Sequence, residues 1–250
     1  MKPILVIGDS CKDVWVYCKC NRLCPDAPVP VLTVDHVVEN GGMAMNVYEN
    51  IRALTTNVKI ITNKNWNLVK KTRYVDLKTN QCFIRIDTNE SDCNSFKDLK
   101  DTIDFNNYSA VAISDYNKGF LDEDDIDYIS KAHPLTFLDT KRRLGKWCEN
   151  ISFIKINRVE FSASEDVIKK NKKIRNNIIK TIGEKGTEYR DKIYAVKEVE
   201  VRDLSGAGDT FLAALVYGVI IGQTIENAIV HANNCATIVV QKKGVATISS

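Results

Sequence analysis

The sequence predicts an α/β fold: a doubly wound, mostly parallel sheet with helices on both faces and a small β flap. Short apolar runs alternate with segments of helical pattern along most of the 250 residues. Several of these runs are continuously apolar, which is typical of strands covered on both faces. Strand–helix alternation of this kind favours parallel strands joined by helices. Ligands of such sheets bind outside the carboxyl ends of the strands.

The expected elements follow one another in this alternating order. The strands are expected at 3–7, 58–61, 110–114, 135–139, 153–156 and 178–182. The helices are expected at 43–54, 122–131, 158–164, 207–221 and 225–240. The basic run 168–177 is expected to be a solvated helix or loop.

Two segments break the alternation and are expected to form a small antiparallel flap, or lid, beside the main sheet. Segment 28–38 is bounded by prolines and then rich in β-branched residues. Segment 73–87 has two alternating runs around Lys78-Thr79-Asn80, which favours a hairpin. Since no linker or repeat divides the chain, residues 1–250 are expected to form a single domain with lid segments at about 14–38 and 72–88.

The composition excludes several classes of function. Lys and Arg number 35 against 32 Asp and Glu, a balance too even to favour nucleic acid or an anionic membrane surface. The longest apolar stretch, 211–221, is interrupted by Gly218 and is shorter than the ~20 residues of a membrane span. The apolar run 4–7 is too short for the core of a signal peptide. We therefore expect a cytoplasmic protein with neither nucleic acid nor membrane as partner.

Cysteines are concentrated near the N-terminus. Four of the eight, Cys11, Cys18, Cys20 and Cys24, fall within the first 24 residues, and Cys82, Cys93, Cys148 and Cys235 follow. Thiolates at such spacing are compatible with a zinc site, but no pair of C-x2-C knuckles accompanies them. Reduced cytosolic thiols, some alternating along a strand, are the favoured interpretation.

The strongest local signal is the nonapeptide Asp-Leu-Ser-Gly-Ala-Gly-Asp-Thr-Phe at 203–211, which follows a strand-like run at 199–201. Its glycines, Gly206 and Gly208, permit close backbone approach, and the helix that begins there presents free N–H groups to an anion. Asp209 is either a capping residue or a general base beside that anion site. Neither a Walker loop nor a G-x-G-x-x-G motif occurs, so phosphates are bound in another way, if at all.

These residues resemble the C-terminal signature of the ribokinase/PfkB family of carbohydrate kinases. Gly41-Gly42-Met-Ala-Met-Asn46 resembles the family's partner motif. Further matches occur in order at Gly8-Asp9…Asp13, Asn157-x-x-Glu160, Thr181-Ile-Gly183-Glu-Lys-Gly186 and Ala232-Asn233. The resemblance covers nearly the whole chain and implies a ribokinase-like kinase domain that transfers the γ-phosphoryl group of ATP, with Mg²⁺, to a sugar hydroxyl.

Four stretches resemble the heptose-7-phosphate kinase domain of the bifunctional bacterial heptose enzyme. They are Cys24-Pro-Asp-Ala-Pro-Val-Pro-Val31, Gln81–Asp87, Ser114-Asp-Tyr-Asn-Lys-Gly119 and Asp139-Thr-Lys141. They imply D-glycero-D-manno-heptose 7-phosphate as the acceptor. A ketose phosphate, ribose or a nucleoside is the alternative acceptor, and a non-catalytic sugar- or nucleotide-binding relative is the alternative function.

The resemblance also implies roles for individual residues. Asp209 is the catalytic base, and the backbone N–H groups of Gly206, Ala207 and Gly208 form the anion hole. Asn157 and Glu160 organise Mg²⁺ through water, although the same pair also fits a helix capping box. The sugar is contacted by Asp13, Gly41, Gly42 and Asn46, and its phosphate by Arg73, Arg85 and Lys118. The nucleotide is contacted by Lys141, Asn157, Gly183, Gly186 and Asn233.

The chain departs from the family pattern in several places, and glycines common after the first helix are also absent, since Leu54 is followed by Thr55-Thr56-Asn57. Leu204 and Ser205 occupy variable positions before the glycines, and Ser205 keeps a hydroxyl there. The Thr-Pro-Asn that precedes the metal motif is Lys155-Ile156-Asn157 here, which removes a proline and adds a charge. The segment 62–71 is shorter than the helix and strand that the family carries there. We expect an edge β-α unit to be missing, with consequences for the lid and for a homodimer formed through it.

Overall fold

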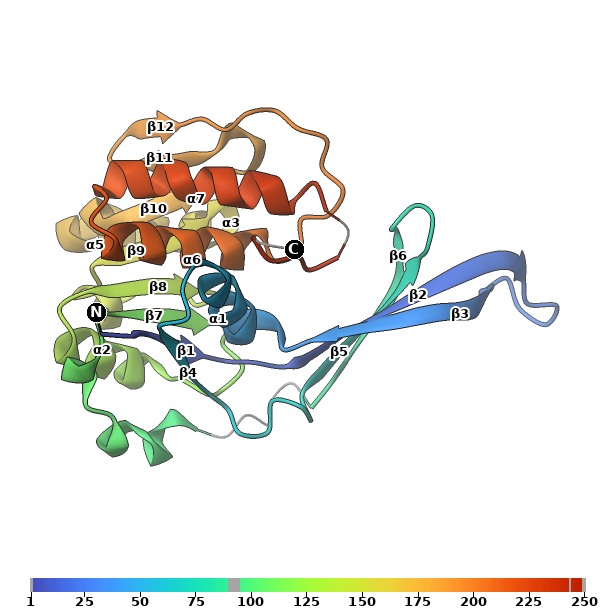
Figure 1. Ribbon diagram of the computed structural model, residues 1–250, viewed down its shortest axis with the longest axis horizontal. Helices are drawn as coiled ribbons and strands as arrows, with labels where there is room; N and C mark the ends of the chain where they lie inside the picture. Colours follow the sequence, from blue (N-terminus) through green and yellow to red (C-terminus); the bar gives the residue numbers. More distant parts are fainter. Residues whose placement is uncertain (1, 90–94, 243, 249–250) are drawn as a thin grey trace.

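The computed structural model describes residues 2–89, 95–242 and 244–248 and contains two sheets (Figure 1). The main sheet has the strand order β12-β11-β10-β9-β8-β7-β1-β4. Its strands are β1 (Ile4–Gly8), β4 (Val58–Thr62), β7 (Ala110–Asp115), β8 (Thr136–Thr140), β9 (Phe153–Asn157), β10 (Ile178–Thr181), β11 (Thr187–Tyr189) and β12 (Lys192–Tyr194). The strands from β10 to β4 are all parallel, whereas β11 and β12 pair in antiparallel fashion.

Helices cover both faces of the main sheet. One face carries α1 (Gly42–Leu54), α6 (Ala207–Ile220) and α7 (Ile225–Val239). The other carries α2 (Glu123–Ala132), α3 (Arg158–Ala163), α4 (Glu165–Lys170) and α5 (Lys172–Asn177). Short 3₁₀ helices lie at Phe96–Asp98, Lys100–Thr102, Phe105–Asn107, Lys146–Cys148 and Gly183–Lys185. Within the described ranges, no helix has the length and apolar character needed to cross a membrane.

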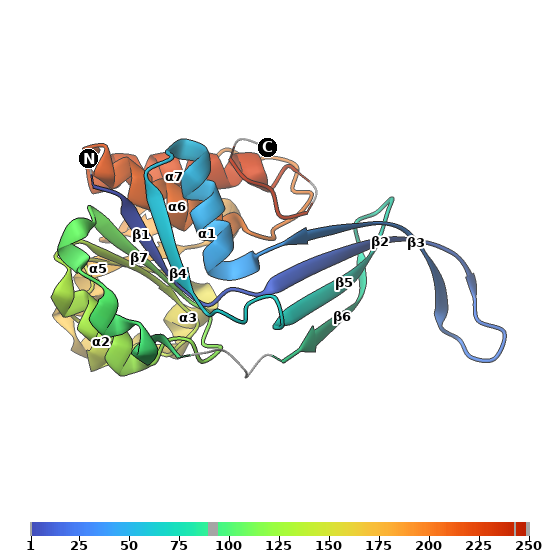
Figure 2. The ribbon, with the colours of Figure 1, turned by 60° about the horizontal axis from the view of Figure 1, so that its bottom comes forward.

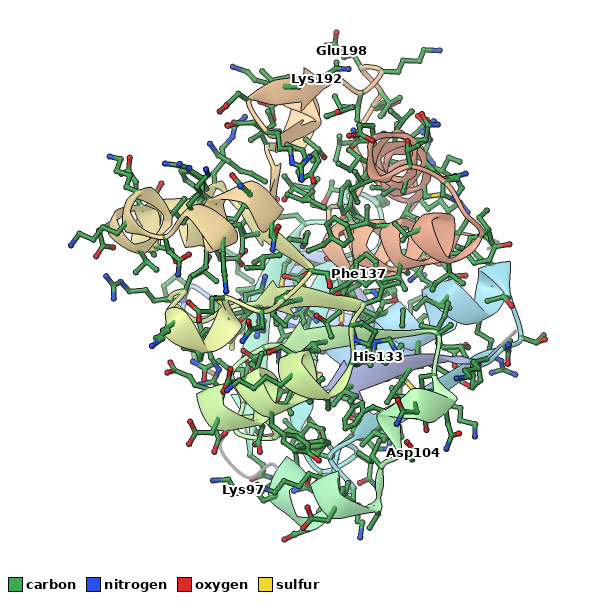
Figure 3. The ribbon with its side chains drawn as sticks, turned by 90° about the vertical axis from the view of Figure 1, so that its left-hand side faces the viewer. Lys97, Asp104, His133, Phe137, Lys192 and Glu198 are labelled. Carbon is green, nitrogen blue, oxygen red and sulfur yellow. The ribbon has the colours of Figure 1, made fainter. Side chains whose placement is uncertain are left out.

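The apolar runs of the sequence fill the two cores on either side of this sheet. In β1, Ile4 and Val6 pack with α1, α6 and α7, while Leu5 and Ile7 pack toward α2. Phe137 of β8, labelled in Figure 3, belongs to the core on the α6 side. The predicted doubly wound α/β fold is therefore confirmed, whereas the single-domain organisation stays a prediction.

The second sheet contains both segments expected in the lid. Its order is β3-β2-β5-β6, with β2 (Lys12–Leu23), β3 (Pro30–Asn40), β5 (Lys70–Asp76) and β6 (Cys82–Thr88). Two antiparallel hairpins meet along a parallel pair, β2 and β5, so the lid is mixed and not purely antiparallel as expected. The reason is topological: β2 and β5 follow β1 and β4, which are themselves parallel neighbours. Figures 1 and 2 show the lid extending away from the main sheet.

The two connections into the lid are joined by hydrogen bonds. Asn63 is fully buried, and its side-chain oxygen accepts the N–H of Ser10 at 2.8 Å. The hydroxyl of Thr62 donates to the carbonyl of Gly8 at 2.8 Å. Seven residues, 63–69, connect β4 to β5 without a helix, and β4 is the edge strand of the main sheet. The structure thus contains no additional β-α unit at this position.

The strand-like run at 199–201 forms no ladder and is not a strand. The N–H groups that follow it, of Arg202 and Asp203, instead donate to the carbonyl of Val240 at 2.8 and 3.2 Å. The basic run 168–177 is helical, because it includes the end of α4 and all of α5.

Candidate active site

The glycine-rich signature forms the beginning of α6. Gly206 precedes the helix with φ 80°, a left-handed conformation that favours glycine. A Cβ atom at Gly206 would lie 2.8 Å from Nδ2 of Asn46, so a side chain is also excluded by contact. This close approach brings α6 and α1 together and places Asp209, in the first turn of α6, against Asn46.

Asp209 is buried and hydrogen-bonded by two side chains. Asn46 Nδ2 donates to its Oδ2 at 2.8 Å, and the Tyr116 hydroxyl donates to its Oδ1 at 2.8 Å. Both of its described hydrogen bonds come from side chains and none from a backbone N–H, so Asp209 does not cap the helix, although its place in the first turn of α6 complements the helix dipole. Asn46 is held in turn by Asn50, whose Nδ2 donates to its backbone and side-chain oxygens at 2.8 and 3.2 Å.

The environment of Asp209 favours proton transfer near neutral pH. Burial raises the pKa of Asp209 to about 6, and the negative charge of Asp139 acts in the same direction. The donors Asn46 and Tyr116, and the cation of Lys155, act against this rise. Burial and the charge of Asp209 raise the pKa of Tyr116 well above its usual value, so its hydroxyl stays a donor. A carboxylate tuned in this way suits a general base.

The first N–H groups of α6 face the same region. No acceptor is described for the N–H groups of Gly208 and Asp209, whereas the N–H of Ala207 donates to the carbonyl of Leu204 at 3.3 Å. Of the three N–H groups expected in the anion hole, that of Ala207 is thus already engaged in a turn. The free groups at a helix beginning attract an anion.

The residues expected to bind the sugar lie where the lid joins the main sheet. Asp13 is 6% exposed, and its carboxylate is bonded to the guanidinium of Arg73 and to the indole N–H of Trp15. Gly41 precedes α1, and Gly42 has φ 51°; a Cβ atom at Gly42 would lie 2.9 Å from the sulfur of Cys11. A ligand hydroxyl that binds the carboxylate of Asp13 therefore competes with the guanidinium of Arg73.

The three cations expected to bind a sugar phosphate fall into two places. Arg73 and Arg85 are direct cross-strand partners on β5 and β6 and so point to the same face of the lid. Arg73 also stacks on Trp15 at 4.8 Å, and Arg85 donates from Nε to Asp87 at 2.7 Å. Lys118, by contrast, lies in the loop after β7 and not in the lid.

Asn157 and Glu160, expected to organise Mg²⁺, form a capping box at the beginning of α3. Asn157 Oδ1 accepts the N–H of Glu160 at 3.0 Å, and Glu160 Oε2 accepts the N–H of Asn157 at 2.8 Å. The described residues contain no group of three acidic, His or Cys side chains that could hold a metal directly. The hard oxygens of this pair fit Mg²⁺ reached through water. A nearby oxygen, Oδ1 of Asp139, is buried without a hydrogen-bond donor.

A chain of charges connects this pair to α6. Lys155 Nζ lies 2.6 Å from Asp139 Oδ2, and Lys141 Nζ lies 3.6 Å from Asp139 Oδ1 and 2.6 Å from Glu160 Oε1. Burial opposes the charge of Lys141, but the carboxylates of Asp139 and Glu160 outweigh it and raise the pKa of Lys141. Lys141 thus lies between Glu160 and Asp139, and its role beside the donor phosphates stays a prediction.

Three residues of this site were not predicted from the sequence: Tyr116, Asp139 and Lys155. Each lies within a motif already noted, but only the sheet brings them together, because β7, β8 and β9 are adjacent parallel strands. Tyr116 is held by Asp9, whose carboxylate accepts its N–H at 2.7 Å. The available signal was their position at or near the carboxyl ends of neighbouring parallel strands.

Three residues expected on the nucleotide side, Gly183, Gly186 and Asn233, lie toward the β11–β12 edge of the sheet. Gly183 and Gly186 have φ 66° and 89°, and a Cβ at Gly186 would lie 2.1 Å from the carbonyl of Tyr194. Asn233 is buried; its Oδ1 accepts the Thr187 hydroxyl at 2.7 Å and its Nδ2 donates to Tyr194 at 2.8 Å. Asn233 therefore joins α7 to β11 and β12, and its polar groups are occupied.

The described cysteines are free thiols. Cys11 and Cys18 are buried, whereas Cys20 and Cys24 are half-exposed. Burial raises the pKa of Cys11 to about 12, which disfavours the thiolate that zinc requires. Cys93 lies outside the described residues. Among the histidines, His133 (Figure 3) hydrogen-bonds main-chain groups of Leu135 and Tyr108.

Comparisons with known proteins agree with this geometry. A family model described as "pfkB family carbohydrate kinase" matches residues 70–250. The bifunctional protein HldE of Helicobacter pylori (strain J99) is 30% identical over 301 residues, covering 100% of this chain and 65% of the relative. HldE of Nitratiruptor sp. is 32% identical over 293 residues, covering 99% of this chain and 63% of the relative. The chain thus spans a little under two thirds of the length of these relatives.

Among solved structures, ribokinase from Thermotoga maritima matches with a TM-score of 0.71 at 16% identity, covering 98% of this chain and 95% of that chain. At this identity the match shows the fold alone, which is ribokinase-like. The family model covers more than half of the residues, including the signature around Asp209. The chain therefore belongs to the PfkB family of carbohydrate kinases, which makes it a sugar kinase phosphotransferase.

Proposed function

We propose that this chain uses ATP and Mg²⁺ to phosphorylate a sugar phosphate, with D-glycero-D-manno-heptose 7-phosphate as the best candidate acceptor. The observation that carries the proposal is the buried Asp209, held between Asn46 and Tyr116 beside free N–H groups at the beginning of α6. A base next to an anion hole is what phosphoryl transfer to a hydroxyl requires.

Asp209 accepts the proton of the acceptor hydroxyl, and a lone pair of that oxygen forms a bond to the γ-phosphorus of ATP. The bond from the γ-phosphorus to the bridging oxygen breaks, and its electron pair leaves with ADP. The N–H groups of Gly208 and Asp209 bind the oxygens of the transferring group. When bound near Asn157 and Glu160 through water, Mg²⁺ neutralises charge on the donor phosphates.

The lid supports an acceptor that carries a phosphate. Arg73 and Arg85 share the lid face that also carries Asp13, because Asp13 and Lys71 are register partners and so are Arg73 and Arg85. Guanidinium groups bind phosphate strongly and in defined geometry. The four stretches similar to heptose-7-phosphate kinase domains, and the similarity to HldE proteins, favour the heptose among sugar phosphates.

The test is ADP release with Mg-ATP across a panel of acceptors: heptose 7-phosphate, fructose 6-phosphate, ribose and a nucleoside. Asp209→Asn should lose at least about 100-fold in kcat while the fold is kept. Turnover of ribose or a nucleoside, with none of the sugar phosphates, would replace the proposed acceptor. Tight sugar binding without ADP release from any acceptor would favour a non-catalytic relative.

We also propose a homodimer formed through the outer face of the lid. Side chains alternate along its strands, and the face opposite Asp13 and Arg73 is mostly apolar, although it also carries the Lys12–Glu39 ion pair. Four of its residues are about half exposed, at 53, 49, 51 and 45%: Val34, Val37, Ile84 and Ile86. An apolar sheet face of this kind marks a contact surface. Light scattering of the wild type and of Ile84→Lys should give a dimer and a monomer, respectively, and a wild-type monomer refutes the dimer.

A cytoplasmic location is part of the same proposal. A kinase needs the ATP pool of the cytoplasm, and the seven described cysteines are all unpaired, as a reducing compartment favours.

A further inference from the structure

Lys155 is a buried cation between the apolar residues Ile154 and Ile156 of β9. Its neighbours on β9, Ile154 and Ile156, pack into the core on the α2 side, so Lys155 points to the opposite face, toward α6. The residue is 4% exposed. Burying an ammonium is costly unless the charge is compensated. Its position therefore calls for an explanation beyond packing.

The ammonium of Lys155 lies beside the anion hole. A Cβ atom built on Gly208 would be only 2.8 Å from Lys155 Nζ. A cation at a helix beginning opposes the helix dipole, which is positive at that end. The N–H groups of Gly208 and Asp209 and the ammonium thus converge on one place, where these donors would bind an anion.

The described partner of this ammonium is one carboxylate. Lys155 Nζ donates to Asp139 Oδ2 at 2.6 Å, and an ammonium has three donors. The other oxygen of Asp139 faces Lys141 at 3.6 Å. Asp139 therefore fixes Lys155 on the α6 side and Lys141 on the side of Glu160, and it leaves donors of Lys155 available to a ligand.

We propose that Lys155 is a catalytic residue whose ammonium binds the non-bridging oxygens of the phosphoryl group during transfer, and that Asp139 is its positioning residue. This inference rests on the proposed function, because it needs ATP as donor. In the step given above, Lys155 neither gains nor loses a proton. It neutralises charge on the phosphoryl oxygens while the bond from the acceptor oxygen to the γ-phosphorus forms and the bond to ADP breaks.

The test compares Lys155→Met with the wild type. We expect kcat to fall about 100- to 1,000-fold, as for other removed transition-state donors, with KM for ATP and acceptor changed less than about threefold. Since this substitution leaves the carboxylate of Asp139 buried without its cation, the double variant Lys155→Met/Asp139→Asn is measured as well. Its folding is checked by thermal unfolding, and it should show the same loss of kcat.

Lys180→Met is the matched control. Lys180 is also a partly buried lysine bound to a carboxylate, that of Glu188 at 3.2 Å. Its neighbour Ile179 packs on the α6 side, so Lys180 points to the opposite face of the sheet. This variant should keep the wild-type kcat. A loss equal to that of Lys155→Met would mean that any lysine removal damages the sheet, which overturns the proposal.

Binding of ADP, with and without aluminium fluoride, gives a readout that does not need turnover. Lys155→Met should bind ADP as the wild type does but lose the gain in affinity that aluminium fluoride provides. If Lys155→Met weakens the binding of ADP equally with and without aluminium fluoride, or keeps the wild-type kcat, the role of Lys155 is overturned while the proposed function stays intact. A wild-type protein that binds no ADP contradicts the proposed function itself, and the role of Lys155 with it.

Discussion

Removing the Tyr116 hydroxyl tests whether Asp209 acts as a base with a tuned pKa. In Tyr116→Phe the ring stays and only the donor 2.8 Å from Asp209 Oδ1 is lost. A hydrogen bond to a charged group contributes about 2 kcal/mol, and one pKa unit corresponds to about 1.4 kcal/mol. Because this bond stabilises the ionised carboxylate, its loss raises the pKa of Asp209 by about 1.5, from about 6 to about 7.5.

The consequence is a shift in the pH dependence of the reaction. At pH 7 the ionised fraction of Asp209 falls from about 90% to about 25%, so kcat/KM falls about fourfold. At pH 9 both proteins have an ionised Asp209 and nearly equal kcat/KM. ADP release measured from pH 5 to 9 gives the acidic limb of the profile for each protein.

Tyr128→Phe serves as the control, because Tyr128 lies on α2 and its ring packs on Phe105. Its profile should match that of the wild type. A Tyr116→Phe profile with an unshifted acidic limb, or a loss that is independent of pH, would refute the base role deduced for Asp209.

Three further predictions concern stability and the acceptor. Because folding raises the pKa of Asp209 to about 6, ionisation of Asp209 destabilises the fold, and stability is lost as pH rises from 4 to 6. Asp209→Asn lacks this ionisation, so its free energy of urea unfolding relative to that of the wild type should be up to about 3 kcal/mol higher at pH 8 than at pH 4. A difference between the two proteins that does not change with pH contradicts this prediction. Gly206→Ala should cost about 1–3 kcal/mol, because of its φ and the contact with Asn46; unchanged unfolding would refute the strain. Arg85→Gln should raise KM for a sugar phosphate about tenfold or more while KM for ATP stays constant, and an equal rise in both contradicts a role at the acceptor.

The periodicity of the sequence was sufficient for the main sheet but not for every strand. The strands β1, β7 and β8 are short apolar runs that the structure buries on both faces, as their apolar composition predicts. The run at 199–201 has the same β-branched character, yet it forms no ladder. Its surroundings, and the carbonyl of Val240 that accepts the next two N–H groups, decide its conformation.

The candidate site was predictable where a motif is local and not where strands converge. Gly206 and Asp209 belong to one turn, so their proximity follows from the sequence. Tyr116 and Lys155 come from strands separated in the chain, and their approach to Asp209 depends on strand order. A lysine in an apolar strand was visible as a departure from the family pattern, but its carboxylate partner became evident only from the register of β8 and β9.

The buried Asn63 has a mechanical consequence for the lid. It joins the connection that leads from β1 to β2 to the connection that leads from β4 to β5. Because β2 and β5 are also hydrogen-bonded along their length, the two connections and the two strands are held together as one unit. Asp13 and Arg73 lie on these two strands and are bonded to each other, so any displacement of the lid relative to Asp209 would move both side chains together.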